Sequence, residues 1–285
     1  MIRSILLPMS DGPLNPVVRD YAFWLARKEG SQIHALAVID VKSFEIPVLG
    51  TPDGFMPSVI TPPLAETQSY LGELTSLARE RLEQFAAESA AAGIRSSTET
   101  RTGIPAEVIA RQAVAHDIVV MGRAGYTRDG TSRDRVDPLV SQVVRTCIRP
   151  VLVTGRGLPP GGDVRRVLLA FDGSSHAARA LPVAAELGGR PGVECTVITV
   201  ASSQAAGLEV IEPAEAFLYH HGLMPGKEVI IGTKASELIC ELVASMQADV
   251  LVMGAYGHSP VREMIFGSTT ERVLSHCGTT VVLQS

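Results

Sequence analysis

Two stretches of the chain, Asp117-Ile118-Val119-Val120-Met121-Gly122-Arg123-Ala124-Gly125 and Asp249-Val250-Leu251-Val252-Met253-Gly254-Ala255-Tyr256-Gly257, are closely similar. Each is an apolar run that ends in Gly-x-x-Gly, a pattern typical of a buried strand followed by a turn. A second similar pair, residues 2–9 and 164–171, opens each copy, and a Gly/Pro-rich joint lies between the copies at residues 155–163. Because similarity at a fixed distance indicates a repeated structural unit, the chain is predicted to be a tandem duplication.

Each copy alternates strand and helix signals. Strands are predicted at 2–9, 32–40, 94–101, 117–121 and 151–154 in the first copy, and at 166–171, 194–201, 228–231, 250–253 and 280–283 in the second. Helices are predicted at 17–28, 64–92, 105–115 and 139–147 in the first copy, and residues 47–63 as an irregular loop. The strands are almost continuously apolar, which indicates parallel sheets covered by helices on both faces. The predicted class is α/β, with two tandem doubly wound domains at residues 1–155 and 164–285.

Composition excludes several classes of protein. The 285 residues are 46% hydrophobic and 19% charged, with a formal net charge of −5, so a globular protein is expected and intrinsic disorder is not. Net acidity and an aromatic content of 5% argue against a nucleic-acid partner. No apolar run approaches the ~20 residues that a membrane span needs, and the apolar run at the N-terminus is too short for a signal peptide. A cytoplasmic protein with no membrane partner is therefore expected.

The four cysteines, Cys147, Cys195, Cys240 and Cys277, are scattered along the chain. Zinc sites and disulfide frameworks usually show closer clustering, so four reduced and mostly buried thiols are expected. No arrangement of Ser, His and Asp, or of paired carboxylates, has catalytic spacing, and neither catalytic nor metal-binding residues are assigned.

The polar residues of the second copy follow its predicted strands, where open parallel sheets bind their ligands. Asp172 follows the first strand, Gly254 and Gly257 follow the fourth, and Gly267-Ser268-Thr269-Thr270 opens a helix. Glycines allow close approach to an anion, and hydroxyls with helix-start N–H groups favour phosphate oxygens. From spacing alone, phosphate binding and a plain arrangement of loop and helix cap both remain open.

Gly254-x-x-Gly257, nine residues and then Gly267-Ser268 resemble the G-2x-G-9x-G-(S/T) nucleotide-binding motif of the universal stress protein family. The resemblance extends over the whole chain and implies five parallel strands in order 3-2-1-4-5 in each domain, with ATP and Mg²⁺ bound across the first and fourth strands. The residues that it assigns to the nucleotide are Ala170, Phe171, Asp172 and Val200 near the adenosine, Met253, Gly254, Tyr256 and Gly257 after the fourth strand, and Gly267, Ser268, Thr269 and Thr270 around the phosphates.

The first copy departs from this motif. Register from Cys147 places Asp137-Pro138 where the second copy has Gly267-Ser268. An acidic residue repels phosphate and proline lacks an N–H, so the first site is expected to be degenerate. Arg128, Arg133 or Arg135 in the preceding loop remain alternatives for binding a different anion.

The resulting hypothesis is a cytoplasmic stress-response or regulatory protein that binds ATP in its second domain and hydrolyses it slowly at most. The alternatives are a slow ATPase or another nucleotide-dependent enzyme, and an interaction module without nucleotide. The family resemblance further implies pairing through the fifth strands, so the two halves are expected to form a pseudo-dimer through residues 151–153 and 281–283. A homodimer of the whole chain is also expected, while the stress signal and any protein partner are not identified.

Overall fold

The computed structural model describes residues 2–9, 16–40, 46–47, 59–60, 64–123, 136–155, 157–158, 162–257 and 268–285. The elements of the first half are β1 (Ser4–Met9), α1 (Pro16–Glu29), β2 (Gln32–Asp40), β3 (Ile46–Pro47), β4 (Val59–Ile60), α2 (Leu64–Ala91), β5 (Ser96–Gly103), α3 (Pro105–Ala113), β6 (Ile118–Gly122), α4 (Pro138–Thr146) and β7 (Val151–Thr154). The second half contains β8 (Arg166–Ala170), α5 (Ser175–Gly188), β9 (Glu194–Ala201), α6 (Gln204–His220), β10 (Gly226–Ile231), α7 (Ala235–Ser245), β11 (Val250–Gly254), α8 (Ser268–His276) and β12 (Thr280–Gln284). Each predicted strand is present, and each predicted helix overlaps an observed one.

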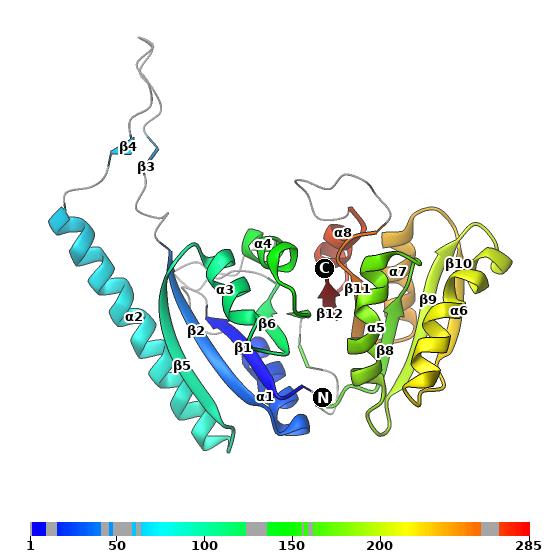
Figure 1. The fold of residues 1–285 in the computed structure, drawn as a ribbon, viewed down its shortest axis with the longest axis horizontal. Helices are drawn as coiled ribbons and strands as arrows, with labels where there is room; N and C mark the ends of the chain where they lie inside the picture. Colours follow the sequence, from blue (N-terminus) through cyan, green and yellow to red (C-terminus); the bar gives the residue numbers. More distant parts are fainter. Residues whose placement is uncertain are drawn as a thin grey trace, which may run out of the picture.

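The strands form one continuous sheet of ten, in the order β10-β9-β8-β11-β12-β7-β6-β1-β2-β5. Counted within each half, the order is 3-2-1-4-5, as the doubly wound prediction requires. All pairs in this sheet are parallel except β7 and β12, which are antiparallel and join the halves. The two predicted five-stranded sheets are therefore fused into one, which crosses the molecule in Figure 1. In the segment predicted as an irregular loop, β3 and β4 form a short antiparallel pair.

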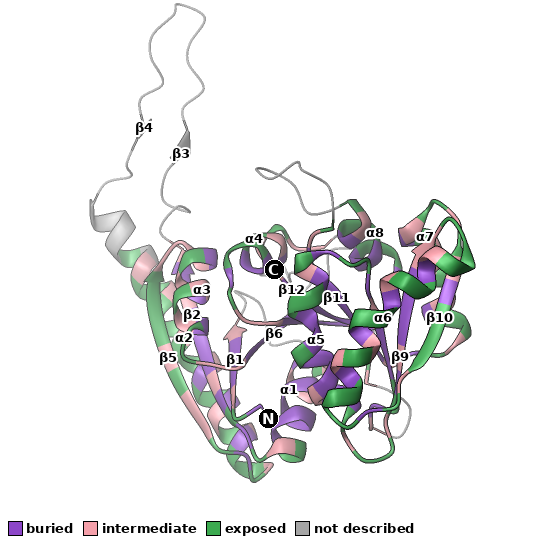
Figure 2. Cartoon of the chain, turned by 45° about the vertical axis from the view of Figure 1, so that its right-hand side comes forward, coloured by how far each residue is buried: buried purple, intermediate pink, exposed green. Residues whose placement is uncertain are grey.

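Helices cover both faces of this sheet. Buried side chains of α1, α2, α5 and α6 share one apolar cluster with the strands, and those of α3, α4, α7 and α8 share the other. Figure 2 shows the buried residues along the strands and the inner faces of the helices. The central strands, such as β6, β7, β11 and β12, are rich in buried apolar residues because helices cover both of their faces, whereas the edge strands β5 and β10 are more polar and more exposed. None of the helices within the described residues combines the length and the apolar character that crossing a membrane requires.

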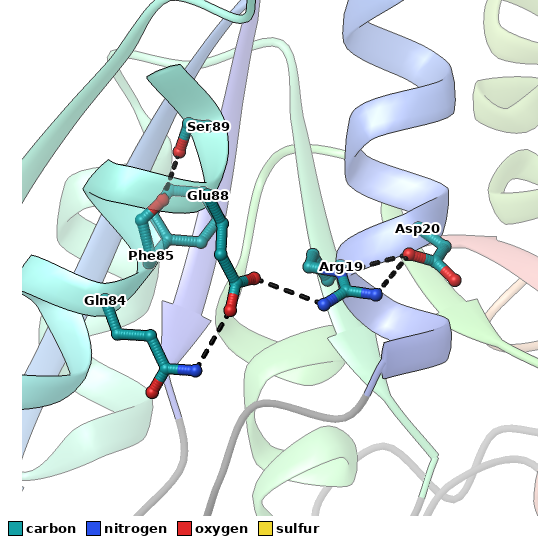
Figure 3. Close-up of polar contacts among 6 residues, drawn as sticks. All are labelled: Arg19, Asp20, Gln84, Phe85, Glu88 and Ser89. Carbon is teal, nitrogen blue, oxygen red and sulfur yellow. Dashed lines mark hydrogen bonds and ion pairs between the residues drawn. The ribbon is translucent and has the colours of Figure 1, made fainter. Parts of the chain in front are cut away.

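A polar contact fixes α2 against α1 on the outer part of the first domain (Figure 3). Arg19 of α1 donates to Glu88 of α2 at 3.2 Å and to the neighbouring Asp20 at 2.9 Å. Gln84 donates to the same Glu88 at 2.9 Å. Beneath this polar layer Phe85 of α2 packs against Phe23 of α1, with 5.9 Å between the ring centroids. The C-terminal part of α2 is thus a packed layer of the domain.

The contacts between the halves include the fifth strands and a second group of residues around Arg190. At the centre of the sheet Val281, Val282 and Leu283 pair with Val153, Leu152 and Val151, so the predicted pseudo-dimer through the fifth strands is confirmed. At the other contact, the guanidinium of Arg190 lies 4.9 Å from the ring centroid of Trp24 and forms an ion pair of 3.1 Å with Glu29. Burial lowers the pKa of Arg190, and the two Glu residues near it oppose that shift.

The expectation of four reduced thiols is wrong for two of them. Cys240 of α7 and Cys277, directly after α8, form a disulfide across 37 residues of sequence. The two helices pack side by side on one face of the sheet, which brings together cysteines that show no clustering in the sequence. Cys147 and Cys195 are free and buried. Burial raises the pKa of the Cys195 thiol to about 11 and also raises that of Cys147, so both are weak nucleophiles.

Candidate nucleotide site

A cavity of about 240 Å³ lies at the carboxyl ends of β8, β9 and β11. This position, beside the point where the strand order reverses between β8 and β11, is where doubly wound sheets bind ligands. All the predicted site residues that the structure describes line the cavity: Ala170, Phe171, Asp172, Val200, Met253, Gly254, Tyr256, Gly257, Ser268, Thr269 and Thr270. The remaining one, Gly267, lies outside the described residues. The folded chain therefore gathers segments that are up to about a third of the chain apart in sequence.

One side of the cavity is apolar. Residues missed in the sequence contribute to it: Ile198 of β9, Ala235 and Ile239 of α7, and Ala177 of α5, together with the buried hydroxyl residue Thr199. Their proximity depends on how α7 packs over β9, for which the local sequence carries no signal. An apolar wall with few polar groups suits a flat heteroaromatic ring.

Asp172 is the charged residue among those that line the cavity. It follows β8, and its Oδ1 accepts a hydrogen bond of 2.9 Å from the backbone N–H of Ser174, just before α5. Ser174 in turn caps α5 by accepting from the N–H of Ala177 at 3.1 Å. The turn into α5 thus orients the Asp172 carboxylate, whose oxygens accept hydrogen bonds from hydroxyl or amino groups.

The two described motif glycines have different neighbours. A Cβ atom on Gly254 would lie 2.7 Å from the backbone N of Ala177 and 2.7 Å from the carbonyl carbon of His176. A Cβ atom on Gly257 would instead lie 2.9 Å from Oδ2 of Asp172. Gly254 is therefore required for the packing of β11 against the start of α5, whereas Gly257 keeps space open beside the Asp172 carboxylate.

The start of α8 forms the other side of the cavity. Ser268 is exposed and Thr269 is half-buried, so their backbone N–H groups and hydroxyls are accessible at the helix N-terminus. Thr270 is buried, and its hydroxyl donates to the carbonyl oxygen of Ala255 at 2.9 Å. The hydroxyl of Thr270 thus fastens α8 to the segment after β11.

An aromatic pair stands at the edge of the site. The rings of His176 and Tyr256 meet edge to face, with 5.3 Å between their centroids. The phenol oxygen of Tyr256 is buried and finds no hydrogen-bond partner within the described ranges. Burial raises the pKa of Tyr256, which therefore stays protonated and can donate.

The equivalent helix start in the first domain is blocked by its own side chain. Asp137 caps α4, and its Oδ1 accepts a hydrogen bond of 2.8 Å from the N–H of Leu139. Pro138 occupies the first helical position, as Ser268 does in α8. A carboxylate thus takes the place that an anion would need. Arg128, Arg133 and Arg135 lie outside the described residues, so the anion alternative for this loop stays a prediction.

Comparison with known proteins agrees with the fold and with the family that the motif resembles. The universal stress protein family matches residues 56–155 and 163–283. A universal stress protein of Synechocystis is 25% identical over 289 aligned positions, covering 96% of each chain. The crystal structure of a universal stress protein from Archaeoglobus fulgidus superposes with a TM-score of 0.72 at 22% identity, covering 99% of this chain and 96% of that one. A functionally unknown protein from Pseudomonas aeruginosa superposes with a TM-score of 0.63 at 18% identity, covering 99% of this chain and 92% of that one. The family matches account for most of both halves, and the chain belongs to the universal stress protein family.

Proposed function

We propose that the second domain binds ATP with Mg²⁺ and that the protein is a stress-response regulator for which ATP is a ligand. The observation that carries the proposal is the convergence of Asp172, the Gly254-to-Gly257 segment and the start of α8 on one cavity. Asp172 supplies a carboxylate, and the start of α8 supplies N–H donors. Gly257 leaves space open beside that carboxylate.

The apolar wall on one side of the cavity and the start of α8 on the other would orient the nucleotide. The adenine ring would lie against the apolar wall of Ile198, Val200 and Ile239, and the ribose hydroxyls would donate to Asp172. The phosphates would extend toward Ser268 and Thr269, where helix N–H groups and the helix dipole favour negative charge. A volume of about 240 Å³ is small for a whole triphosphate, because ligand pockets usually measure about 300–1,000 Å³. It suits a nucleoside with its phosphates at the open side.

The lack of cationic side chains among the described lining residues favours a role for Mg²⁺. The residues that line the described cavity include no Lys or Arg, so a triphosphate would meet helix N–H groups rather than side-chain cations. Mg²⁺, which binds mainly through phosphates and water, supplies the missing positive charge. With no Lys or Arg on the described lining and with Asp172 assigned to the ribose, we expect turnover below roughly 1 s⁻¹, the low end for ordinary enzymes.

The test is ATP titration by calorimetry of the chain and of the variant S268P. Proline is tolerated at the first helical position but removes the N–H that a phosphate would accept from. Since hydrogen bonds to charged groups contribute about 1.5–3 kcal/mol, affinity should fall about tenfold to a hundredfold. The matched control is Q204P, which places proline at the first position of α6, a helix that does not line the cavity.

The control variant should bind ATP as the unmodified chain does. Equal affinity of S268P and the unmodified chain would refute the phosphate assignment. An unmodified chain that carries no adenine nucleotide after purification and gives no heat with ATP would refute the proposed function.

A further inference from the structure

The disulfide joins the two helices that form the walls of the candidate site. Cys240 follows Ile239, which lines the cavity from α7. Cys277 directly follows α8, whose first turn lines the cavity on the other side. The 37-residue loop that the bond closes contains Gly254, Tyr256, Gly257 and the start of α8. The whole phosphate side of the site thus lies within one covalent ring.

The first domain lacks this bond, although it has one of the two cysteines. Cys147 follows α4 as Cys277 follows α8, and each backbone N–H bonds to the carbonyl four residues earlier, at 2.8 and 2.9 Å. Cys240 is the sixth residue of α7, and the sixth residue of α3 is Ala110. The disulfide therefore occurs in the copy with the intact nucleotide motif and not in the copy whose helix start is blocked by Asp137.

Besides the disulfide, α7 and α8 are held together by apolar packing and by an ion pair. The ion pair between Arg272 and Glu237 spans 3.6 Å, with both side chains about half exposed, and such pairs contribute little. Apolar packing remains, since Ile239 and Val243 share a buried cluster with Val273 and Leu274. The oxidised bond adds a covalent restraint to the position of α8, and a preorganised site binds its ligand more tightly than a loose one.

We infer that the Cys240–Cys277 disulfide is a redox switch that sets the nucleotide affinity of the second domain, high when oxidised and lower when reduced. The inference rests on the proposed function. Cys240 is the accessible member, since it is half-buried and Cys277 is only 3% exposed.

The reductant is a dithiol. Its thiolate attacks Sγ of Cys240, the S–S bond breaks, and Cys277 leaves as a thiolate that takes up a proton. The second thiol of the reductant then attacks the mixed disulfide, which releases Cys240 as a thiol and leaves the reductant as a disulfide. Two electrons and two protons pass to the protein, and oxidation by a disulfide reverses the step.

The coupling must be reciprocal. If oxidation raises ATP affinity by some factor, ATP must favour the disulfide over the dithiol by the same factor, because both describe one thermodynamic cycle. The effect of ATP on the equilibrium between disulfide and dithiol can be measured by counting thiols, without measuring nucleotide binding.

The experiment titrates the full chain with Mg-ATP after equilibration in oxidised or in reduced dithiothreitol, with thiols counted by alkylation and mass spectrometry. Reduction should weaken binding about fivefold or more, the usual lower bound for coupled sites. The variant C240A, which copies Ala110, should bind like the reduced protein under both conditions, and C147A should respond to redox as the unmodified chain does. ATP should also shift the dithiothreitol midpoint of the unmodified chain toward the disulfide.

Equal affinity in both verified redox states, or four free thiols after oxidation, would overturn the switch while leaving ATP binding in place. Absence of ATP binding in both states would overturn the proposed function and the switch together. If C240A fails to fold, the comparison of oxidised and reduced unmodified chain decides by itself.

Discussion

Gly254 and Gly257 belong to the same motif but are constrained by different neighbours. The position of Gly254 is set by backbone atoms of His176 and Ala177, which cannot rotate away. The variant G254A should therefore lower the free energy of unfolding by about 1–3 kcal/mol, as overpacking does. Denaturant unfolding of the purified variant measures the loss.

The matched variant G257A should behave in the opposite way. Its new methyl group meets the end of the Asp172 side chain, which can move aside. Stability should change little, while ATP affinity falls because the carboxylate is displaced. Equal stability loss in G254A and G257A would show that the difference in neighbours does not matter.

We expect His116 to make the first domain sensitive to pH. Burial and the neighbouring imidazole of His34 lower the pKa of His116, and Asp117 opposes that shift. The two rings stack with 5.3 Å between centroids, Nδ1 of His116 meets the Ser4 hydroxyl at 2.6 Å, and His34 contacts Glu99 at 3.3 Å. The fold therefore favours the neutral ring of His116.

Below the ordinary histidine pKa of about 6.5, the unfolded chain binds a proton that the folded chain takes up only at lower pH. The contribution of His116 is present above that pH and is lost as pH falls through the folded pKa. In thermal unfolding between pH 7.5 and 5, H116N should lose less stability than the unmodified chain. A parallel decline in both proteins would exclude His116 as the cause.

The disulfide should contribute to global stability as well as to the site. Closing a loop of 37 residues reduces the entropy of the unfolded chain, which corresponds to about 4 kcal/mol in the loop-entropy treatment. Reduction should lower the free energy of unfolding of the chain by about 4 kcal/mol, which denaturant unfolding measures as a lower midpoint. The free thiol Cys147 gives the control, since C147A should leave the effect of reduction intact. A midpoint that does not respond to reduction would contradict the prediction.

The sequence predicts individual elements well and contacts between elements poorly. The apolar runs at β6 and β11 identify buried parallel strands because both faces are covered, and the repeat then places the remaining strands. The cavity residues that follow β8 and β11 are predictable for the same reason, since strand ends converge at one edge of a sheet. The wall from Ile198 and Ile239 and the pairing of Cys240 with Cys277 are not, because they depend on how α7 packs over β9 and beside α8.

On the face of the sheet that α1, α2, α5 and α6 cover, one continuous apolar core spans both halves. The apolar cluster that contains Leu25 of α1 also contains Leu152 of β7, Val282 of β12 and Leu187 of α5, so it runs through both halves. The linker is fastened to α1, where Trp24 donates to Asp163 at 3.3 Å and Lys28 forms an ion pair with it at 2.9 Å. Pairing the fifth strands within one chain leaves β5 and β10 as the sheet edges, so a homodimer, which stays a prediction, would have to form through another surface.

The pairing of β7 with β12 forms the seam between the halves. A double-mutant cycle tests how strongly this seam couples them. Leu152 and Val282 face each other in the register of β7 and β12 and are 1% and 0% exposed. L152A should lower the free energy of unfolding by about 2–5 kcal/mol, and V282A by less because it removes fewer carbon atoms. Since the first variant already loosens the seam, the double variant should lose less than the sum, with a coupling of about 0.5–3 kcal/mol.

The control pairs V282A with I33A. Ile33 is equally buried but lies in β2, four strands from β12 and hence about 19 Å away. Those two losses should add, because side chains this far apart do not share contacts. Additive losses for L152A and V282A as well, or two separate unfolding transitions in the unmodified chain, would mean that the halves are independent domains. Coupling at the seam together with additivity at Ile33 would mean that β7 and β12 make the two halves one cooperative unit.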